Sequence, residues 1–232
     1  MIEEGQAPGA DGGGAEKSSG KQPGKKKGSF WKELPILLVV AIAVAFVVRT
    51  FVVQTYYIPS GSMETTLELD DRVLVNKLVY DFSEPDRGEI IVFTAPESWR
   101  SSMEEDEFIK RVIAVGGDHV VCCDDSGRIT VNGEPLDESD YLYVNPLTGE
   151  QNVPSQDAFD VEVPDGRLWV MGDHRQASGD SRERFIRTGG DVEASTISAD
   201  AVIGKAFVLF WPVDHANWFS VPDTFEDIPA PS

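Results

Sequence analysis

One short stretch of the sequence places several hydroxyl groups close together. Residues 56–67 read YYIPSGSMETTL, in which Ser60, Ser62 and Thr65 surround one glycine and one proline. This composition is typical of a solvated turn, but it could also hold one serine oxygen in the open as a nucleophile. The choice depends on a base, because a serine hydroxyl attacks poorly until a neighbouring group removes its proton.

Histidine is one candidate base, and the chain has three: His119, His174 and His215. His174 lies in MGDHRQASGDSRERF beside acidic residues and serines, so a Ser-His-Asp arrangement is conceivable. No serine, however, has the Gly-x-Ser-x-Gly surroundings of the α/β-hydrolase nucleophile. A structural or surface histidine is the simpler interpretation of all three.

Lysine is the other candidate base, and Lys110 in the stretch FIKRVIAV fits best. The pKa of a free lysine is about 10.4, so burial must lower it by roughly 2–3 units before a neutral amine is common near pH 7–8. In a strand, the face of Lys110 would also carry Phe108 and Val112, while Arg111 would point to the other side. The alternative is a surface lysine whose amine reaches water.

A polar segment from Gly172 to Arg182, GDHRQASGDSR, is the third feature with chemical potential. It holds glycine, aspartate, arginine and serine at close intervals and has little apolar bulk. It could be a solvated turn. It could also be a network that supports a site, since a neutral amine needs partners that orient its lone pair.

The elements that must position these residues begin with a polar tail and an apolar run. Residues 1–32 are rich in glycine, lysine, serine and proline, and we expect them to be a disordered cytoplasmic tail. Residues 34–48 read LPILLVVAIAVAFVV, and the apolar character resumes after Arg49 and Thr50. About 20 such residues cross a bilayer core, so a transmembrane helix is predicted over residues 33–54.

Orientation follows from four lysines that precede the run, at positions 25, 26, 27 and 32. They predict a cytoplasmic N-terminus and an extracytoplasmic remainder. A cleaved signal peptide is the competing interpretation. It is disfavoured because the region before the run exceeds 30 residues, and because a small-x-small triplet such as Ala41-Ile42-Ala43 lies inside the run. A buried helix is a further alternative, against which the adjoining lysines argue.

The remainder of the chain has a β pattern. Runs of β-branched residues alternate with turn pairs such as Asn132-Gly133 and Asp165-Gly166, and no segment of 12 or more residues has a clear helical period. We predict a mostly β, antiparallel extracytoplasmic domain over residues 55–221. Within it, residues 145–165 are expected to be a loop insertion and residues 188–200 a polar connector. Residues 222–232 are expected to be a frayed C-terminal tail.

Charge and cysteine content exclude some classes of function. The 232 residues include 20 Lys and Arg against 40 Asp and Glu, a net charge of -20, and such a chain repels nucleic acid. No CxxC or Cys/His spacing suits zinc, so no metal and no cofactor are expected. Cys122 and Cys123 are adjacent, and two separate thiols are favoured over a disulfide between neighbours.

Three motifs occur in order after the apolar run: PSGSM followed by TL, FIKRVIAVGGD, and GDHRxxSxDSR. Together they resemble bacterial type I signal peptidases (leader peptidases), which are membrane-anchored serine proteases with a Ser-Lys dyad. The resemblance covers roughly residues 30–212 and also includes DDRVLVNK, RGEIIVF and IGKAFVLFWP. It leaves out the N-terminal tail and the predicted insertion.

The resemblance implies roles for particular residues of this sequence. Ser62 matches the nucleophile and Lys110 the general base. The Ser60 hydroxyl and the Ser62 backbone N–H match the oxyanion hole, and Ser178 matches a hydroxyl that orients the lysine. Four residues of one loop match supporting charged groups: the pair Asp180 and Arg182, together with Asp173 and Arg175. Five match the lining of small, shallow substrate pockets: Ile58, Met63, Leu67, Phe108 and Ile109.

Three positions depart from the family pattern. Thr65 and Gly116 stand where the family usually has proline, and His174 stands where many members have asparagine. The first two changes concern turn geometry. No catalytic role is expected for His174.

The resulting hypothesis is a membrane-anchored endopeptidase that removes N-terminal signal peptides from exported preproteins after a small-x-small motif. Its implied partners are preprotein signal peptides, membrane lipid and the secretion translocon. The main alternative is a membrane-anchored binding domain without catalysis, which would leave the three motifs as coincidence. A self-cleaving Ser-Lys repressor is disfavoured by the acidity and by the absence of DNA-binding helices.

Overall fold

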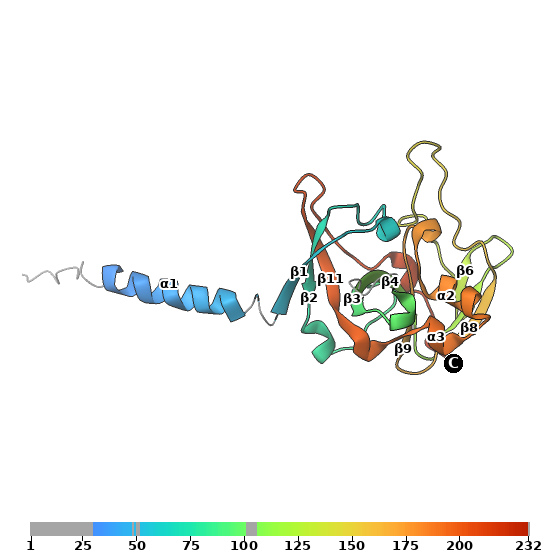
Figure 1. The fold of residues 1–232 in the computed structure, drawn as a ribbon, viewed down its shortest axis with the longest axis horizontal. Coiled ribbons are helices and arrows are strands. Elements are labelled where there is room, and N and C mark those ends of the chain that lie inside the picture. The colour runs from blue at the N-terminus through green and yellow to red at the C-terminus, as the bar shows by residue number, and fades with distance from the viewer. Residues whose placement is uncertain (1–29, 48, 50–51, 101–105, 232) are drawn as a thin grey trace, which may run out of the picture. The chain divides into compact units, whose positions relative to one another are not determined.

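The structure is a computed structural model that describes residues 30–47, 49, 52–100 and 106–231. The chain divides into two units, residues 1–43 and residues 44–232, which are treated separately. The predicted disordered tail lies outside the described residues except for its last three positions, which belong to a helix. All residues of chemical interest lie in the second unit (Figure 1).

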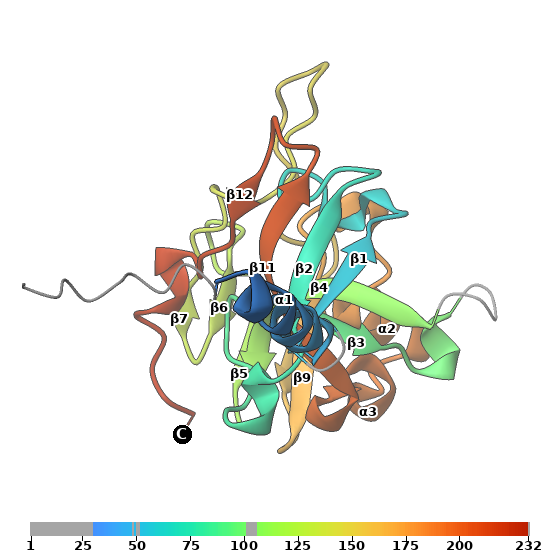
Figure 2. The same ribbon diagram turned by 90° about the vertical axis from the view of Figure 1, so that its left-hand side faces the viewer.

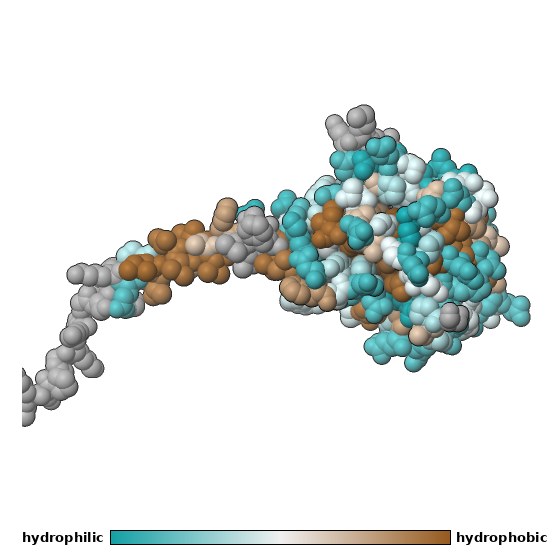
Figure 3. Space-filling view, turned by 90° about the horizontal axis from the view of Figure 1, so that it is seen from below, coloured by the Kyte–Doolittle hydropathy of each residue, from teal (hydrophilic) through white to brown (hydrophobic). Residues whose placement is uncertain are grey.

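Helix α1 spans Phe30–Val47 and so ends seven residues before the predicted C-terminal limit at residue 54. Its described side chains are mostly apolar and exposed, and Figure 3 shows them as a continuous hydrophobic surface. Among the helices that the structure describes, none combines the length and the apolar character needed to cross a membrane.

The second unit contains a large antiparallel sheet in the order β1-β2-β11-β3-β4-β9-β10, with β12 paired to β11 (Figure 2). This confirms the predicted antiparallel β domain. The strands are β1 (Val53–Tyr57), β2 (Arg72–Asn76), β3 (Ile90–Thr94), β4 (Glu107–Val115), β9 (Arg167–Met171), β10 (Ile197–Ser198), β11 (Val202–Trp211) and β12 (Asn217–Trp218).

A smaller antiparallel sheet has the order β7-β6-β5-β8. Its strands are β5 (His119–Cys122), β6 (Ile129–Val131), β7 (Glu134–Pro135) and β8 (Phe159–Glu162). Their buried side chains form one cluster with Trp169 and Met171 of β9, so the two sheets share core residues.

Strand β3 shows how the large sheet is packed on both sides. Ile90 and Val92 belong to the cluster beneath the serine turn, whereas Ile91 and Phe93 belong to a cluster on the opposite face. Side chains alternate between faces along a strand, so an apolar residue at each position reflects burial on both sides. This central strand pairs with β4, which carries Lys110 opposite Ile91.

Strand β4 is paired differently along its two halves. β3 pairs with it from Glu107 to Arg111, whereas pairing with β9 begins only at Arg111. Among the described residues, the segment from Glu107 to Lys110 therefore has no strand partner on its β9 side. Among the described strands, Arg111 is the position of β4 that has a register partner on both β3 and β9.

Short helices occupy segments that were predicted to be irregular. They are the α-helices α2 (Ser181–Thr188) and α3 (Val192–Ser195), and the 3₁₀ turns η2 (Gly61–Met63), η3 (Val79–Asp81), η4 (Glu97–Trp99), η5 (Arg175–Ala177), η6 (Ala199–Ala201) and η7 (Asp223–Phe225). The Asp180 carboxylate caps α2 by accepting from the Glu183 N–H, and Gly189 ends it in the left-handed conformation. The predicted connector 188–200 thus contains α3 and β10.

Three further expectations need correction. Residues 145–165 are not loop throughout, because they include β8, which pairs with β5. The C-terminal tail is not frayed, since Phe225 and Ile228 are buried in the core of the smaller sheet. Cys122 and Cys123 are not separate thiols, because a disulfide joins them across a cis peptide bond.

Gly204 of β11 tests how closely the strands of the large sheet pack. A Cβ atom there would overlap the Asn76 carbonyl oxygen and lie 2.8 Å from Val75 Cγ1. We expect Gly204→Ala to lower the free energy of unfolding by about 1–3 kcal/mol, the usual effect of overpacking. Urea denaturation of the full chain would measure it.

Gly179→Ala is the matched control, because a Cβ there would meet no atom closer than 3.7 Å. It should change the free energy of unfolding by no more than about 0.5 kcal/mol. Equal stability of the Gly204→Ala and Gly179→Ala variants would contradict the proposed strand contact.

Candidate active site

The serine-rich turn connects β1 to β2 and is anchored by its apolar residues. Ile58, Met63 and Leu67 are at most 2% exposed and pack into the cluster beneath the turn. Between these anchors, η2 carries Ser62, which is 6% exposed. The Glu64 side chain folds back over Gly61, where a Cβ atom would lie 2.7 Å from Glu64 Cδ. The turn is therefore a packed element and not a solvated loop.

Lys110 approaches this turn from β4. Its Nζ lies 2.6 Å from Ser62 Oγ and donates to the Ile109 carbonyl oxygen at 3.0 Å. Lys110 is only 4% exposed, and Phe108 and Val112 on the same strand face pack in one apolar cluster. The two residues singled out in the sequence as nucleophile and base are thus in hydrogen-bonding contact.

Burial changes the protonation of this amine. Desolvation lowers the pKa of Lys110 from 10.5 to about 8, while the charges of Asp180 and Asp173 act in the opposite direction. Loss of hydration is the larger effect, since a charged ammonium is poorly solvated among apolar side chains. A substantial fraction of Lys110 is therefore neutral at mildly alkaline pH and able to accept the Ser62 proton.

Ser60 lies at the mouth of the turn and is exposed. Its hydroxyl donates to Ser62 Oγ across 3.5 Å, a long hydrogen bond. The Ser62 backbone N–H belongs to η2, two residues further along the chain. Both predicted oxyanion donors therefore belong to one turn.

Asp173 is held by groups from two other elements. Arg111 Nε and Nη2 bond its two carboxylate oxygens at 2.9 and 2.7 Å, and Thr66 Oγ1 donates to it at 2.5 Å. Arg111 Nη1 also reaches the Gly88 carbonyl oxygen. Asp173 and Arg111 are both almost fully buried. This pair ties β4 to the loop after β9, on the strand face opposite Lys110.

Arg175 is bound elsewhere, although it belongs to the same loop as Asp173. It forms a buried bidentate pair with Glu138 and donates from Nε to the Gly172 carbonyl oxygen. Arg182 donates to the Arg175 carbonyl oxygen and lies 3.5 Å from Asp180. The predicted Asp180–Arg182 pair is therefore present, and Glu138 is a partner that sequence reasoning missed.

Ser178 is 6% exposed, but its hydroxyl forms no hydrogen bond with any described residue, Lys110 included. This differs from the predicted direct contact with the lysine. Gly172 explains how Ser178 comes so near the turn. A Cβ atom at Gly172 would overlap both Ser178 Oγ and the Ser62 carbonyl oxygen, so only glycine fits there.

His174 contacts the serine turn without reaching the serine hydroxyl. Its backbone N–H donates to the Ser62 carbonyl oxygen at 3.1 Å, and its ring Nδ1 lies 2.8 Å from Glu64 Oε2. The ring also stacks on Tyr143 with 3.8 Å between centroids. Glu64 and Tyr143 were not singled out in the sequence. The only signal for Glu64 in the sequence was its position as a polar residue two places after Ser62.

The predicted pocket residues fall in two apolar clusters. Ile58, Met63, Leu67 and Ile109 gather beneath the serine turn, and Phe108 packs on the other face against Phe93. Phe108 and Ile109 are half-buried on the β4 segment that lacks a partner on its β9 side. No cluster of potential metal ligands occurs among the described residues.

A family model described as "Signal peptidase, peptidase S26" matches residues 31–211. The chain belongs to this signal peptidase family. A "Probable signal peptidase I" of Mycobacterium leprae is 38% identical over 241 aligned residues, covering 85% of this chain and 82% of that protein.

Two further relatives agree. A "Signal peptidase I" of Mycobacterium tuberculosis is 37% identical and covers 89% of this chain and 81% of its own length. A "Probable signal peptidase I-1" of Synechocystis is 42% identical over 203 residues, or 87% of this chain and 91% of that protein. The family resemblance noted in the sequence is therefore confirmed, and this signal peptidase is a serine endopeptidase.

Burial of Lys110 has a measurable effect on stability. Below pH 8, folding must place a charged amine in an apolar site. Between pH 8 and 10.5, the unfolded chain holds a proton that the folded chain does not, so stability rises with pH. We expect Lys110→Met to raise the free energy of unfolding at pH 7 by up to about 3 kcal/mol. This gain should fall towards zero by pH 10.5.

Denaturant unfolding of both proteins from pH 6 to 10.5 would measure the gain. Lys77→Met, the same change of residue type at a half-buried lysine outside the site, is the control and should not produce the gain in stability at pH 7. A Lys110→Met variant that is less stable than wild type by the same amount at every pH would contradict the argument.

Proposed function

We propose that this chain is a membrane-anchored Ser-Lys peptidase that cleaves signal peptides from exported preproteins after a small-x-small motif. The observation that carries the proposal is the 2.6 Å contact between Ser62 Oγ and a buried Lys110 amine with a pKa lowered to about 8. A binding domain has no need of a neutral lysine beside a serine. An amine in this state is suited to activating a nucleophile.

The proposed reaction follows from the position of these two groups. Neutral Lys110 takes the Ser62 proton as Oγ attacks the scissile carbonyl carbon, and the resulting ammonium then protonates the leaving amine. Negative charge that develops on the carbonyl oxygen is stabilised by the Ser60 hydroxyl and the Ser62 backbone N–H. Water then attacks the acyl ester, with Lys110 again accepting a proton.

We assign a supporting role to the charged groups around the dyad. Asp173 is bound by Arg111, and Asp180 accepts from the Gly172 and Glu183 N–H groups, so both carboxylates already have partners. Partnered in this way, they raise the pKa of Lys110 less than desolvation lowers it. Arg175 and Arg182 hold the loop that presents them, and Ser178 completes the surroundings of the amine.

The substrate is proposed to bind as an extended chain. The β4 segment Glu107–Lys110 lacks a partner on its β9 side, and an extended peptide can pair with such an edge. Phe108, Ile109 and the residues beneath the serine turn (Ile58, Met63 and Leu67) would then lie beside alternate substrate side chains. Tight packing around Met63 and Leu67 is compatible with small side chains.

The proposed membrane anchor is the apolar segment that precedes β1. It is supported by the apolar run from Leu34 to Val53, which is about as long as a bilayer core is thick. The lysines before this run favour a cytoplasmic N-terminus. Membrane lipid and the secretion translocon are the partners expected of an enzyme that meets its substrates as they cross a cell membrane.

Cleavage of a preprotein by the purified full chain tests the dyad. We expect Ser62→Ala and Lys110→Ala each to reduce the cleavage rate by at least about 10³-fold, since neither group works without the other. The released mature protein and signal peptide would be identified by mass spectrometry.

Two control variants match the change of residue type. Ser126→Ala lies in the exposed turn before β6, and Lys77→Ala lies after β2, so both should cleave at the wild-type rate. Undiminished cleavage by either Ser62→Ala or Lys110→Ala would rule out the proposed mechanism.

The pH dependence of the reaction provides a separate test. Protonated Lys110 is inactive, so kcat/KM should rise about tenfold per pH unit below the Lys110 pKa of about 8 and level off above it. A stopped assay with a peptide substrate between pH 6 and 10 would record the profile. A rate that does not change across this range would contradict a lysine base.

A further inference from the structure

The hydroxyl of Ser178 is a buried polar group that the protein itself does not satisfy. It forms no hydrogen bond with any described residue, although Ser178 is only 6% exposed. A buried hydroxyl without a partner is unfavourable by about 1–3 kcal/mol. Such a group retained beside a reaction centre indicates a partner outside the protein chain.

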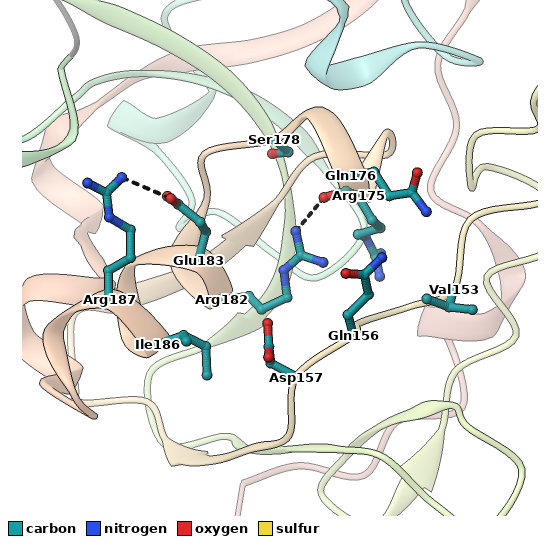
Figure 4. Close-up of a pocket in the computed structure, with 10 residues that line it drawn as sticks. All are labelled: Val153, Gln156, Asp157, Arg175, Gln176, Ser178, Arg182, Glu183, Ile186 and Arg187. Atoms are coloured by element: carbon teal, nitrogen blue, oxygen red, sulfur yellow. Dashed lines mark hydrogen bonds and ion pairs between the residues drawn. The ribbon is translucent and has the colours of Figure 1, made fainter.

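Ser178 also lines a cavity of about 210 Å³ (Figure 4). The cavity lies between η5, the start of α2 and the segment before β8. Figure 4 shows Ser178 at one side of the lining, with Asp157 and Ile186 at the opposite side. Val153 and Ile186, which are 49% and 41% exposed, lie where the cavity approaches the surface. The cavity thus extends from solvent to the Ser178 side chain.

The inner end of this cavity is close to the reaction centre. Ser178 Oγ and the Ser62 carbonyl oxygen each lie within 3.0 Å of the position that a Cβ atom on Gly172 would take. The Ser62 hydroxyl, in turn, lies 2.6 Å from Lys110 Nζ. Ser178, which lines the cavity, is therefore also close to the backbone of Ser62.

The charges of the lining favour water over an ionic occupant. Arg175 is paired with Glu138, Arg182 lies beside Asp180, and Arg187 donates to Glu183 at 2.9 Å. Each arginine of the cavity thus has an acidic partner, and Asp157 at the margin disfavours an anion. Water occupies about 30 Å³ per molecule in the liquid, so a polar cavity of this size has room for several molecules.

We propose that this cavity is a water channel that supplies the hydrolytic water for the acyl-enzyme through Ser178. The inference rests on the proposed function, because it requires a Ser62 ester. Lys110 is almost fully buried, and an interior route would let water reach its amine while the acyl group occupies the site. In this proposal, the Ser178 hydroxyl binds a water molecule and positions it towards Lys110 Nζ.

Deacylation of Ser62 is an ordinary ester hydrolysis. The water oxygen bonds to the acyl carbon, and one water proton moves to neutral Lys110. The bond between the acyl carbon and Ser62 Oγ then breaks, and Lys110 returns the proton to Ser62 Oγ. The carboxylic acid product leaves, and the enzyme is restored. Ser178 positions the water and also links the lysine to the cavity without a direct bond between the two side chains.

The test separates the formation of the acyl-enzyme from its hydrolysis. The full chain in detergent is acylated with a p-nitrophenyl ester of a short acyl chain, whose release of nitrophenol reports acylation. Intact-mass spectrometry then follows loss of the acyl group from Ser62. Val153→Trp and Ile186→Trp narrow the cavity at partly exposed positions. We expect each to slow acyl loss about tenfold, a barrier increase of about 1.4 kcal/mol, with the acylation rate unchanged.

Leu147→Trp is the matched control, because Leu147 is 93% exposed on the same segment as Val153 but does not line the cavity. It should lose the acyl group at the wild-type rate. Unchanged acyl loss in both cavity variants would overturn the inference. A decrease in the acylation rate equal to the decrease in acyl loss would also overturn it, because the cavity would then lie on the path of the substrate. Failure of wild-type Ser62 to become acylated would instead overturn the proposed function.

A second measurement uses the unaltered protein and so does not depend on how the variants fold. Methanol and tert-butanol are added as competing acyl acceptors, and the ester products are quantified. A narrow interior route should give the methyl ester and almost no tert-butyl ester, by a ratio well above that for the same acyl donor in free solution. A ratio equal to that in free solution would overturn the channel.

Discussion

The site depends on keeping the Lys110 amine away from water. Loss of hydration lowers the lysine pKa from 10.5 to about 8, although two aspartates draw it upward. The lowered pKa of Lys110 therefore depends on the other partners that these two carboxylates bind. Asp173 is bound by Arg111 from the opposite face of β4, and Asp180 serves as the N-cap of α2. Were either carboxylate unpaired, its field would favour the ammonium form, and the amine would be a weaker base at neutral pH.

The loop after β9 therefore has to be rigid, and its polar contacts provide that rigidity. Arg175 is buried against Glu138, and Arg182 holds the Arg175 carbonyl oxygen. A buried ion pair of this kind contributes little net stability, but removal of one partner leaves an unpaired charge that is strongly destabilising. These pairs fix one loop conformation. Gly172 lets that loop approach the Ser62 backbone at a distance that no other residue permits.

Local patterns in the sequence were sufficient to predict the strands and to single out Ser62 and Lys110, which lie in contact in the structure. The Asn132-Gly133 pair lies in left-handed conformations between β6 and β7, as its turn chemistry predicts. Because side chains alternate between the two faces of a strand, the sequence predicted Lys110 on the apolar face of β4 and Arg111 on the other face. The partners of the arginines could not be predicted in this way. Glu138 is 37 residues from Arg175 and lies in a segment without a regular pattern, so only the three-dimensional fold brings the two together.

The missed elements have similar causes. Strand β8 has only four residues, which is too few for alternation to stand out within a loop-like composition. Phe225 and Ile228 lie among prolines and acidic residues that are typical of a frayed tail, yet the smaller sheet has an apolar surface that they cover. Such residues are buried because strands distant in the sequence provide the apolar surface that they cover. A short stretch of sequence does not reveal that surface.

The two candidate bases His174 and Lys110 both lie beside the serine turn, but they make different contacts with it. His174 donates its backbone N–H to the Ser62 carbonyl oxygen, but its ring Nδ1 faces Glu64 and Gly61, and the ring stacks on Tyr143. These contacts use the ring to hold the turn, and none of its hydrogen bonds goes to Ser62 Oγ. Of these two candidates, Lys110 is the one that contacts Ser62 Oγ, and it does so in an apolar setting that suits proton transfer. His174 thus contacts the turn through its backbone and its ring, and the proposed function takes Lys110 as the group that accepts the Ser62 proton.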